Sequence, residues 1–407
     1  MQTQLAPEYA ARPDGQEAEA ILRKCVHCGF CTATCPTYQL LGDELDGPRG
    51  RIYLIKQVLE GAEPTRKTQM HLDRCLTCRN CESTCPSGVQ YGHLVDIGRK
   101  IVDEKVPRPV GEKALRWALK EGLPSPLFAP AMKAGQMVRG LLPEALKAKV
   151  PAPQDAGAWP TREHARKVLM LAGCVQPAMM PNINTATARV LDAVGIQTVI
   201  APKAGCCGAV KFHLNDQAGG MAEMRANIDA WWPLVEAGGV EAIVMNASGC
   251  GVTVKEYGHL LAHDEAYAAK AARISMLTRD LSEIMPEFEE QLGARLKGKI
   301  AKRVAYHPPC TLQHGQQIRG KVEGVLRAAG VDVQLCADSH LCCGSAGTYS
   351  VLHPEIAHEL RDRKLASLQA TGPDEIVSAN IGCMTHLQSG TDTPVTHWIE
   401  LVDRALA

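Results

Sequence analysis

The sequence of 407 residues has no excess of either charge and no long apolar run. Lysine and arginine together number 44, as do aspartate and glutamate, so no net field attracts nucleic acid or acidic lipid. No stretch reaches the roughly 18 uncharged apolar residues of a membrane-spanning helix. Residues 1–16 are polar and lack the apolar centre of a secretory signal. We therefore expect a cytoplasmic protein, or one bound to a membrane through partners, that does not bind nucleic acid.

The sequence also lacks the motifs with which enzymes bind nucleotides. It has no G-x-G-x-x-G fingerprint after a strand and no Walker A run. No Ser/His/Asp constellation can be recognised in it. Because hydride chemistry needs a flavin or a nicotinamide, we expect any such step to occur on a partner chain.

Cysteine, by contrast, is abundant, with 17 residues. Without an export signal, this number indicates a reducing compartment and metal ligation rather than a disulfide scaffold. Two runs, residues 25–36 and 75–86, share the spacing C-x2-C-x2-C-x3-C-P. This spacing is typical of ferredoxin-type ligation of [4Fe–4S] clusters, in which the fourth cysteine of each run ligates the other cluster. Zinc ribbons, which pair C-x2-C motifs, fit it less well.

Two [4Fe–4S] clusters are therefore predicted, and with them one-electron transfer. The predicted ligands of the first cluster are Cys25, Cys28, Cys31 and Cys85. Those of the second cluster are Cys35, Cys75, Cys78 and Cys81.

Residues 17–105 form the first predicted unit. It has helical patterns at 17–24 and 49–60 and little strand pattern, and it resembles the helical ferredoxin arrangement of succinate dehydrogenase-type iron–sulfur subunits. Residues 106–165 are predicted to be a proline-rich linker with short helices. Its segment 131–149 is basic and amphipathic, and we expect Pro143 to break it. Two interpretations of this segment stay open: it binds a membrane surface or a partner, or it packs on its own protein.

From residue 166 the pattern becomes α/β and repeats, which predicts two further units, 166–300 and 301–407. In both halves a cysteine stands 32 positions before a Cys-Cys-Gly triplet, and a helix is expected to end at a glycine, Gly195 or Gly330. Strands that alternate with helices predict a mainly parallel sheet in each half. The expected fold class is thus α+β multidomain: a helical two-[4Fe–4S] ferredoxin-like domain followed by two duplicated α/β cysteine-rich domains.

Each half places four cysteines at strand ends or in the loops that follow, where ligand sites of α/β sheets collect. Adjacent cysteines can face one metal where Gly208 and Gly344 permit an unusual turn. His307 and His340 flank the second set and could complete a metal shell or relay a proton. A third iron–sulfur centre, a zinc site, a redox dithiol and cysteines that only pack all stay open. The two sets are Cys174, Cys206, Cys207 and Cys250, and Cys310, Cys342, Cys343 and Cys383.

The two halves resemble the CCG cysteine-rich domains found in heterodisulfide reductase and in several respiratory iron–sulfur proteins. The full pattern of those domains has a further cysteine three positions before the last one. This chain has Ala247 and Asn380 there. The departure removes one ligand per half and argues against a non-cubane [4Fe–4S] cluster in both.

The order of all these motifs is similar to that of the iron–sulfur subunits of glycolate oxidase, most tellingly at residues 25–53 and 338–349. The resemblance implies an electron relay. Glycolate is oxidised at FAD on partner flavoprotein subunits, and electrons pass through this chain towards a quinone or another membrane acceptor. It also implies peripheral attachment to the inner membrane and no glycolate oxidation by this chain alone. The third subunit of anaerobic glycerol-3-phosphate dehydrogenase shares the plan. A heterodisulfide reductase-like thiol enzyme and a zinc-holding scaffold are further alternatives.

Overall fold

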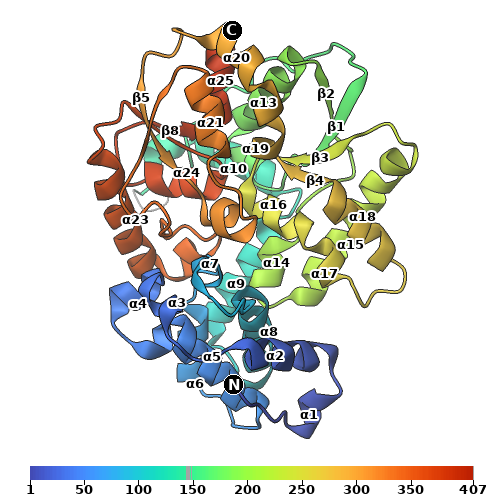
Figure 1. Ribbon diagram of the computed structural model, residues 1–407, viewed down its shortest axis with the longest axis vertical. Coiled ribbons are helices and arrows are strands. Elements are labelled where there is room, and N and C mark those ends of the chain that lie inside the picture. Colours follow the sequence, from blue (N-terminus) through green and yellow to red (C-terminus); the bar gives the residue numbers. More distant parts are fainter. Residues whose placement is uncertain (144–146, 148, 407) are drawn as a thin grey trace.

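The chain folds into a helical N-terminal unit below two α/β halves that stand side by side (Figure 1). The computed structural model describes residues 1–143, 147 and 149–406. In the described part of the chain before Arg166 there is no strand, as the sequence predicts for the first unit. The helices of that unit are α1 (Pro7–Ala10), α2 (Pro13–Lys24), α3 (Phe30–Ala33), α4 (Pro36–Leu41), η1 (Glu44–Asp46), α5 (Pro48–Leu59), α6 (Arg66–Asp73), α7 (Asn80–Thr84) and α8 (Tyr91–Lys105).

The core of the helical unit lies between α2, α5 and α8. Ile55 on α5 and Leu94 on α8 are both almost completely buried in it. Gly98 allows the close approach of the two helices, because a Cβ atom there would lie 2.6 Å from Ile55. Four helices of this unit, α1, α2, α4 and α5, begin with a proline, whose fixed φ suits the first helical turn. One of these prolines is Pro36, so α4 starts directly after the fourth cysteine of the first run.

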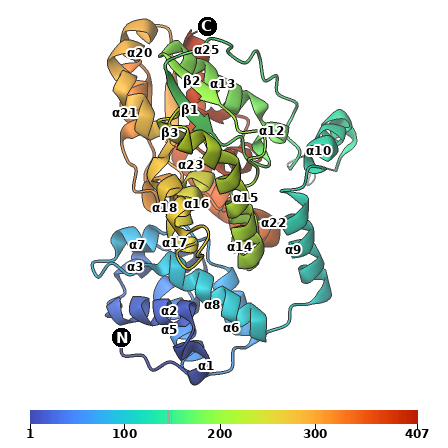
Figure 2. The ribbon, with the colours of Figure 1, turned by 90° about the vertical axis from the view of Figure 1, so that its right-hand side faces the viewer.

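The linker leaves the helical unit as α9 (Val110–Gly122) and continues as α10 (Phe128–Met137) and the short turn η2 (Arg139–Leu141). Figure 2 shows α9 running along the side of the molecule and α10 standing out from it. The helix predicted from 131, with a break at Pro143, differs from the structure at both ends. The helix begins earlier and already ends at Met137, since glycine at 140 weakens a helix before Pro143 is reached. Residues 144–146 and 148 of the predicted segment lie outside the described residues.

Each half contains a four-stranded sheet in which every neighbouring pair is parallel. The first sheet has the order β2-β1-β3-β4 and the second β6-β5-β7-β8. The short edge strands β4 and β8 were not predicted, because three residues are too few to show a period. The strands are β1 (Arg166–Met170), β2 (Ile196–Val199), β3 (Ala242–Met245), β4 (Thr278–Asp280), β5 (Arg303–His307), β6 (Asp332–Leu335), β7 (Glu375–Ser378) and β8 (Val395–His397).

The helices of the two halves cover both sheets. In the first half they are α12 (Gln176–Met179), α13 (Pro181–Ala193), α14 (Ala209–His213), α15 (Gln217–Glu236), α16 (Ser248–Lys255), α17 (Tyr257–Leu260), α18 (Ala268–Leu277), α19 (Leu281–Ile284), η3 (Met285–Phe288) and α20 (Glu289–Leu296). In the second they are the π-helical turn η4 (Thr311–Gly315), α21 (Lys321–Ala328), α22 (Tyr349–Leu352), α23 (Pro354–Gln369), α24 (Ile381–Gln388) and α25 (Trp398–Leu406). Gly195 and Gly330 follow α13 and α21 with positive φ, so the predicted helix ends are confirmed.

One hydrophobic core joins the two halves. Val168 and Val190 of the first half belong to the same buried cluster as Val304 and Trp398 of the second. Helix α25, at the end of the chain, packs on α13 of the first half. The repeat boundary at 300/301 therefore divides the sequence pattern but not the core.

Candidate iron–sulfur and thiol sites

The first predicted ligand set converges at one place in the helical unit. Cys25, Cys28, Cys31 and Cys85 all line a small cavity between the first cysteine loop and the loop after α7. Burial and the nearby thiols of Cys25 and Cys85 raise the pKa of Cys31 to about 11. The fourth sulfur thus comes from the other run, as the spacing predicts.

The second predicted set converges in the same way, but deeper. Burial and the neighbouring Cys78 and Cys75 thiols raise the pKa of Cys81 well above its usual value, with Cys35 also contributing. Cys35 is buried and its thiol lies 3.3 Å from the Thr37 hydroxyl oxygen. The Tyr91 hydroxyl lies 3.6 Å from the Cys75 sulfur.

The two cysteine loops have matching backbones. His27 and Gly29 in the first run, and Thr77 and Arg79 at the equivalent positions of the second, all have positive φ. For a residue other than glycine this conformation carries a cost, and it persists where the surrounding structure imposes it. The turns bring the thiols of each loop to face one another.

These thiols fit an iron–sulfur core chemically. Four sulfurs in a desolvated site cannot all ionise, because burial and mutual repulsion both favour the protonated form. A cationic metal core removes both obstacles, since thiolates are the ligands that it binds.

Buried cations support the loop of the second set. The Arg51 guanidinium, which is 1% exposed, donates to the His71 carbonyl oxygen over 2.7 Å and to the Thr37 hydroxyl over 3.2 Å. Arg99 donates to the carbonyl oxygens of Leu72 and Cys75 over 2.8 Å and 2.5 Å. Both residues fix the backbone that leads into this loop and place positive charge beside its sulfurs.

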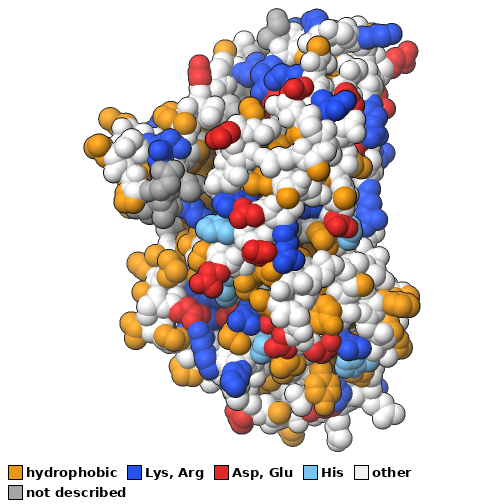
Figure 3. Space-filling model, turned by 90° about the vertical axis from the view of Figure 1, so that its left-hand side faces the viewer, with side chains coloured by type: hydrophobic (Ala, Val, Ile, Leu, Met, Phe, Trp, Pro, Cys, Tyr) orange, Lys and Arg blue, Asp and Glu red, His pale blue; other side chains and the backbone are white. Residues whose placement is uncertain are grey.

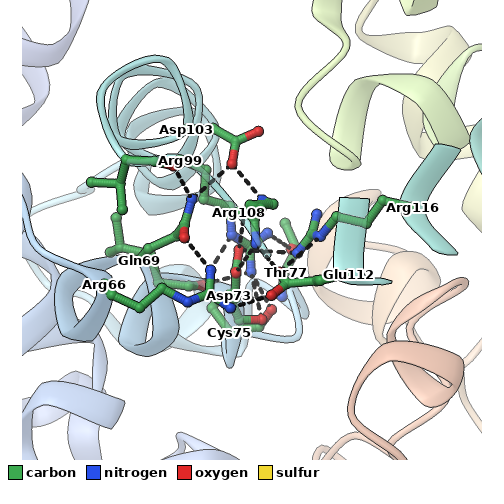
Figure 4. Close-up of polar contacts among 12 residues, drawn as sticks. Arg66, Gln69, Asp73, Cys75, Thr77, Arg99, Asp103, Arg108, Glu112 and Arg116 are labelled. Atoms are coloured by element: carbon green, nitrogen blue, oxygen red, sulfur yellow. Dashed lines mark hydrogen bonds and ion pairs between the residues drawn. The ribbon is translucent and has the colours of Figure 1, made fainter. Parts of the chain in front are cut away.

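Figure 4 shows how a neighbouring network fastens the linker to this loop. Asp73, at the end of α6, accepts a hydrogen bond from Arg108 over 2.6 Å and forms an ion pair with Arg116 of α9 over 3.2 Å. Arg108 also contacts Asp103 and Glu112. Burial raises the pKa of Asp73, but the Arg108 and Arg116 guanidinium groups outweigh it and hold this pKa below its usual value.

The four cysteines of the first α/β half also come together. Contacts with the Cys174 and Cys207 thiols lower the pKa of Cys206, which makes it the preferred thiolate of the set. Cys207 in turn contacts Cys250, which lies in α16. Gly208 turns the chain after the cysteine pair with a φ of 91°, as expected from the sequence.

Glu223 belongs to this first site but was not predicted. Burial and the adjacent Cys206 raise its pKa to about 8, while Lys211 stands 3.3 Å from its carboxylate. No signal in the sequence singled out Glu223, because its long helix α15 carries many polar residues.

The second half arranges its four cysteines in a row that reaches the helical unit. Contacts with the thiols of Cys342 and Cys78, together with burial, raise the pKa of Cys310 well above its usual value. Cys343 contacts Cys342 on one side and Cys383 on the other. One thiol of the second half therefore lies against a predicted ligand of the second cluster.

Of the two histidines that flank this set, only His307 points into it. Its ring and the sulfurs of Cys343 and Cys383 lie within 4.8 Å of one another. His340 contributes its carbonyl oxygen instead, which accepts from Asn80 and contacts His314. Cys336, the remaining cysteine of this half, is a buried core residue.

Asn380 explains in part how the halves do without the further cysteine of the CCG pattern. Ala247 and Asn380 directly precede α16 and α24. The Asn380 side chain accepts from the Gly249 amide over 3.1 Å and donates to the Cys383 sulfur over 3.7 Å. Asn380, which stands where the full pattern has a cysteine, therefore links the second half to the first.

Comparison with known proteins agrees with this architecture. A family model described as a 4Fe-4S dicluster domain matches residues 21–89. A second, described as a cysteine-rich domain, matches 168–255 and 304–388.

Two full-length relatives carry the same description. The chain is 57% identical to the glycolate oxidase iron–sulfur subunit of Escherichia coli K12, over 100% of this chain and 99% of the relative. It is 31% identical to the probable glycolate oxidase iron–sulfur subunit of Bacillus subtilis 168, over 96% and 92%. Lactate utilization protein A of Bacillus licheniformis matches 54% of the chain at 25% identity. The chain therefore belongs to the family of glycolate oxidase iron–sulfur subunits.

Proposed function

We propose that this subunit relays electrons from glycolate, oxidised at FAD on partner flavoprotein subunits, towards a membrane quinone. The observation that carries the proposal is the convergence of two four-thiol sets, each completed by a cysteine from the other run. The names of the two full-length relatives support glycolate as the substrate.

In this proposal Cys25, Cys28, Cys31 and Cys85 hold one [4Fe–4S] cluster, and Cys35, Cys75, Cys78 and Cys81 hold the other. Each cluster supplies reversible one-electron transfer when bound. The chain's own residues hold the thiolates, exclude water and set the local charge. Around the second set, Arg51 and Arg99 place positive charge in a buried site, which favours the more negative, reduced form.

The first cluster site is the one that reaches the surface. Cys28 is exposed, and beside it the side chains of Val26 and Phe30 are 69% and 62% exposed. We infer that electrons are exchanged with a flavoprotein partner here, since apolar surface around a redox centre suits docking. The second site lies deeper, against the α/β halves.

We further propose that the subunit attaches peripherally to the cytoplasmic face of the inner membrane through the segment from Leu127 to Leu141, which contains α10 and η2. None of the described helices is both long and apolar enough to cross a membrane. No residue of α10 is buried, and Leu127, Met137 and Leu141 are 74%, 86% and 88% exposed. Figure 3 shows hydrophobic side chains on the protrusion beside the grey residues. Lys133 and Arg139 add positive charge to this apolar surface, which suits anionic lipid.

Electron paramagnetic resonance of the reduced, anaerobically purified subunit tests the cluster assignment. Two interacting [4Fe–4S] signals are expected, and Cys28→Ser should remove one and keep the other. Cys336→Ser, a buried cysteine outside both sets, is the matched control and should keep both. Retention of both signals in Cys28→Ser would contradict the ligand assignment.

Two further measurements test the division of labour. The isolated subunit should bind iron and sulfide but oxidise no glycolate, so turnover by it alone would refute the role of the partners. Flotation with vesicles containing anionic lipid should be lost in a Leu127→Ser, Leu141→Ser variant. Equal binding by this variant would exclude the segment from Leu127 to Leu141 as the attachment site.

A second candidate function is favoured by the contact of Cys310 with Cys78. The clusters would deliver two electrons, which with two protons convert a disulfide substrate into two thiols. Thiol alkylation of the cluster-loaded subunit should then abolish disulfide reduction, whereas glycolate-linked electron transfer by the assembled complex should persist.

A further inference from the structure

His307 is an isolated polar side chain in the core of the second half. It is the last residue of the central strand β5, and its relative exposure is 0%. Among the described residues, neither of its ring nitrogens has a hydrogen-bond partner. An imidazole without partners in a dry site is costly, so this position calls for a ligand.

The other buried histidines of the described chain do not share this property. His71 contacts the Asp46 carboxylate over 3.0 Å, and His314 contacts the His340 carbonyl oxygen over 2.9 Å. His386 and His397 likewise contact the carbonyl oxygens of Ala357 and Asn246. His307 is therefore the exception among five buried rings.

The internal repeat supplies a comparison within the same chain. Leu171 occupies the position of His307 in the first half, and it is buried among apolar neighbours. Cys207 and Cys250 match Cys343 and Cys383 in the repeat. The second half thus differs from the first by a nitrogen donor placed beside two buried sulfurs.

We propose that His307, Cys343 and Cys383 bind a single zinc ion. Their three donor atoms lie within 4.8 Å of one another, which suits one metal ion, and all three residues are buried. One imidazole and two thiolates form a donor set typical of tetrahedral zinc, with one position left open.

Charge also favours this ion. Binding of Zn²⁺ releases one proton from each of the two thiols, and the neutral imidazole keeps the complex without net charge. Lys364 is buried nearby, with its ammonium group 2.7 Å from the Asp338 carbonyl oxygen. A neutral complex is compatible with that cation and with the apolar surroundings.

The zinc ion would connect three distant segments: the end of β5, the loop after β6 and the first turn of α24. Cys342, next to Cys343, contacts Cys310, which lies against Cys78. The ion therefore holds the second half in the position that brings Cys310 to the second cluster. This consequence, unlike the zinc site itself, rests on the proposed function.

Elemental analysis of the anaerobically purified full-length subunit tests the site. About one zinc and about eight iron atoms per chain are expected in the wild type. His307→Leu, which installs the residue of the first half, should lower zinc at least ~10-fold, given the cost of disturbing a metal shell, and keep the iron. His386→Gln, a buried and hydrogen-bonded histidine of the same half, should keep both.

The zinc K-edge absorption spectrum of the wild type tests the site without any variant, and one nitrogen with at least two sulfur neighbours is expected. Wild type with full iron but no zinc, or zinc unchanged in His307→Leu, would overturn the proposal. Iron beyond that of two cubanes that disappears in His307→Leu would overturn the assignment to zinc. Low iron with full zinc would instead count against the proposed electron relay and leave the zinc site standing.

Discussion

A single carboxylate, Glu256, joins the second cysteine loop to the first α/β half. It stands at the end of α16 and accepts from both terminal nitrogens of Arg79, with one contact at 2.9 Å. His93 of α8 lies 3.3 Å from the same carboxylate and 3.4 Å from Glu17. Replacing Glu256 by Gln keeps the shape and removes the charge, so it tests what this charge contributes.

The expected change in the free energy of unfolding follows from the pKa of Glu256. Burial raises this pKa, but contacts with His93 and Arg79 outweigh burial and lower it from 4.5 to about 2. The difference corresponds to about 3 kcal/mol of stability. Because the folded pKa is depressed, this contribution is present above pH 4.5 and is lost as the pH falls towards 2. Glu256→Gln should therefore lower the free energy of unfolding by about 3 kcal/mol near pH 6.

His93 makes the stability of the fold depend on pH in the opposite direction, with a loss at high pH. Burial lowers its pKa, but Glu17 and Glu256 raise it from 6.5 to about 9. Its contribution is complete below pH 6.5 and is lost as the pH rises through 9. The wild type should thus lose stability over this range, and in Glu256→Gln the loss should be smaller and should end at lower pH, because one of the two carboxylates is gone.

Urea unfolding of the anaerobic holoprotein, followed by cluster absorbance at pH 4 to 9, measures both effects. Glu241→Gln is the matched control, since Glu241 pairs over 2.9 Å with a surface arginine and both side chains are about 40% exposed. That exposed pair should contribute less than about 1 kcal/mol. Equal losses in the two variants, or an unchanged alkaline profile in Glu256→Gln, would refute the reasoning.

Three further outcomes are expected. Arg51→Met removes a buried cation beside the second set, so potentiometric titration should show the reduction potential of that cluster falling by roughly 60–120 mV, the equivalent of a charge-assisted hydrogen bond. Gly344→Ala forces a Cβ atom to 2.5 Å from the Ala357 carbonyl oxygen at a φ of 87°, and should lower the free energy of unfolding in urea by more than about 2 kcal/mol. Gly195→Ala has the same φ but open space, and should cost about 1 kcal/mol; equal costs would contradict the steric argument. Asp73→Asn removes a carboxylate that Arg108 and Arg116 share, while Glu112 still contacts both, and should cost up to about 3 kcal/mol, with faster tryptic cleavage around α9. Unchanged cleavage would mean that the pair does not fasten the linker.

The sequence predicted those parts of the structure that short-range spacing determines. Thiols three positions apart must share a loop, so the convergence around Cys31 and around Cys81 could be expected from the two runs alone. The parallel sheets followed from the alternation of strands and helices, and the turn at Gly344 from its place after a cysteine pair. In each case the information lies within a few residues of the feature.

Features that depend on packing between distant segments were not predictable. Nothing near Cys310 in the sequence indicates that its thiol would meet Cys78, because that contact depends on how the second half docks on the helical unit. Glu223 enters the first thiol site for a similar reason, through the packing of α15. The sequence predicts a helix from 131 that breaks at Pro143, whereas α10 begins at Phe128 and ends at Met137, with no residue buried in a core.

The shared core of the two halves has a consequence for synthesis on the ribosome. The apolar face of α13 is covered by α25, so Val190 stays without its partner Trp398 until α25 emerges. The first half would expose this surface while more than 100 further residues are made, on the order of 5 to 20 s at ordinary translation rates. A chain that stops before α25 should therefore aggregate or be degraded, even though all 17 cysteines are already in place.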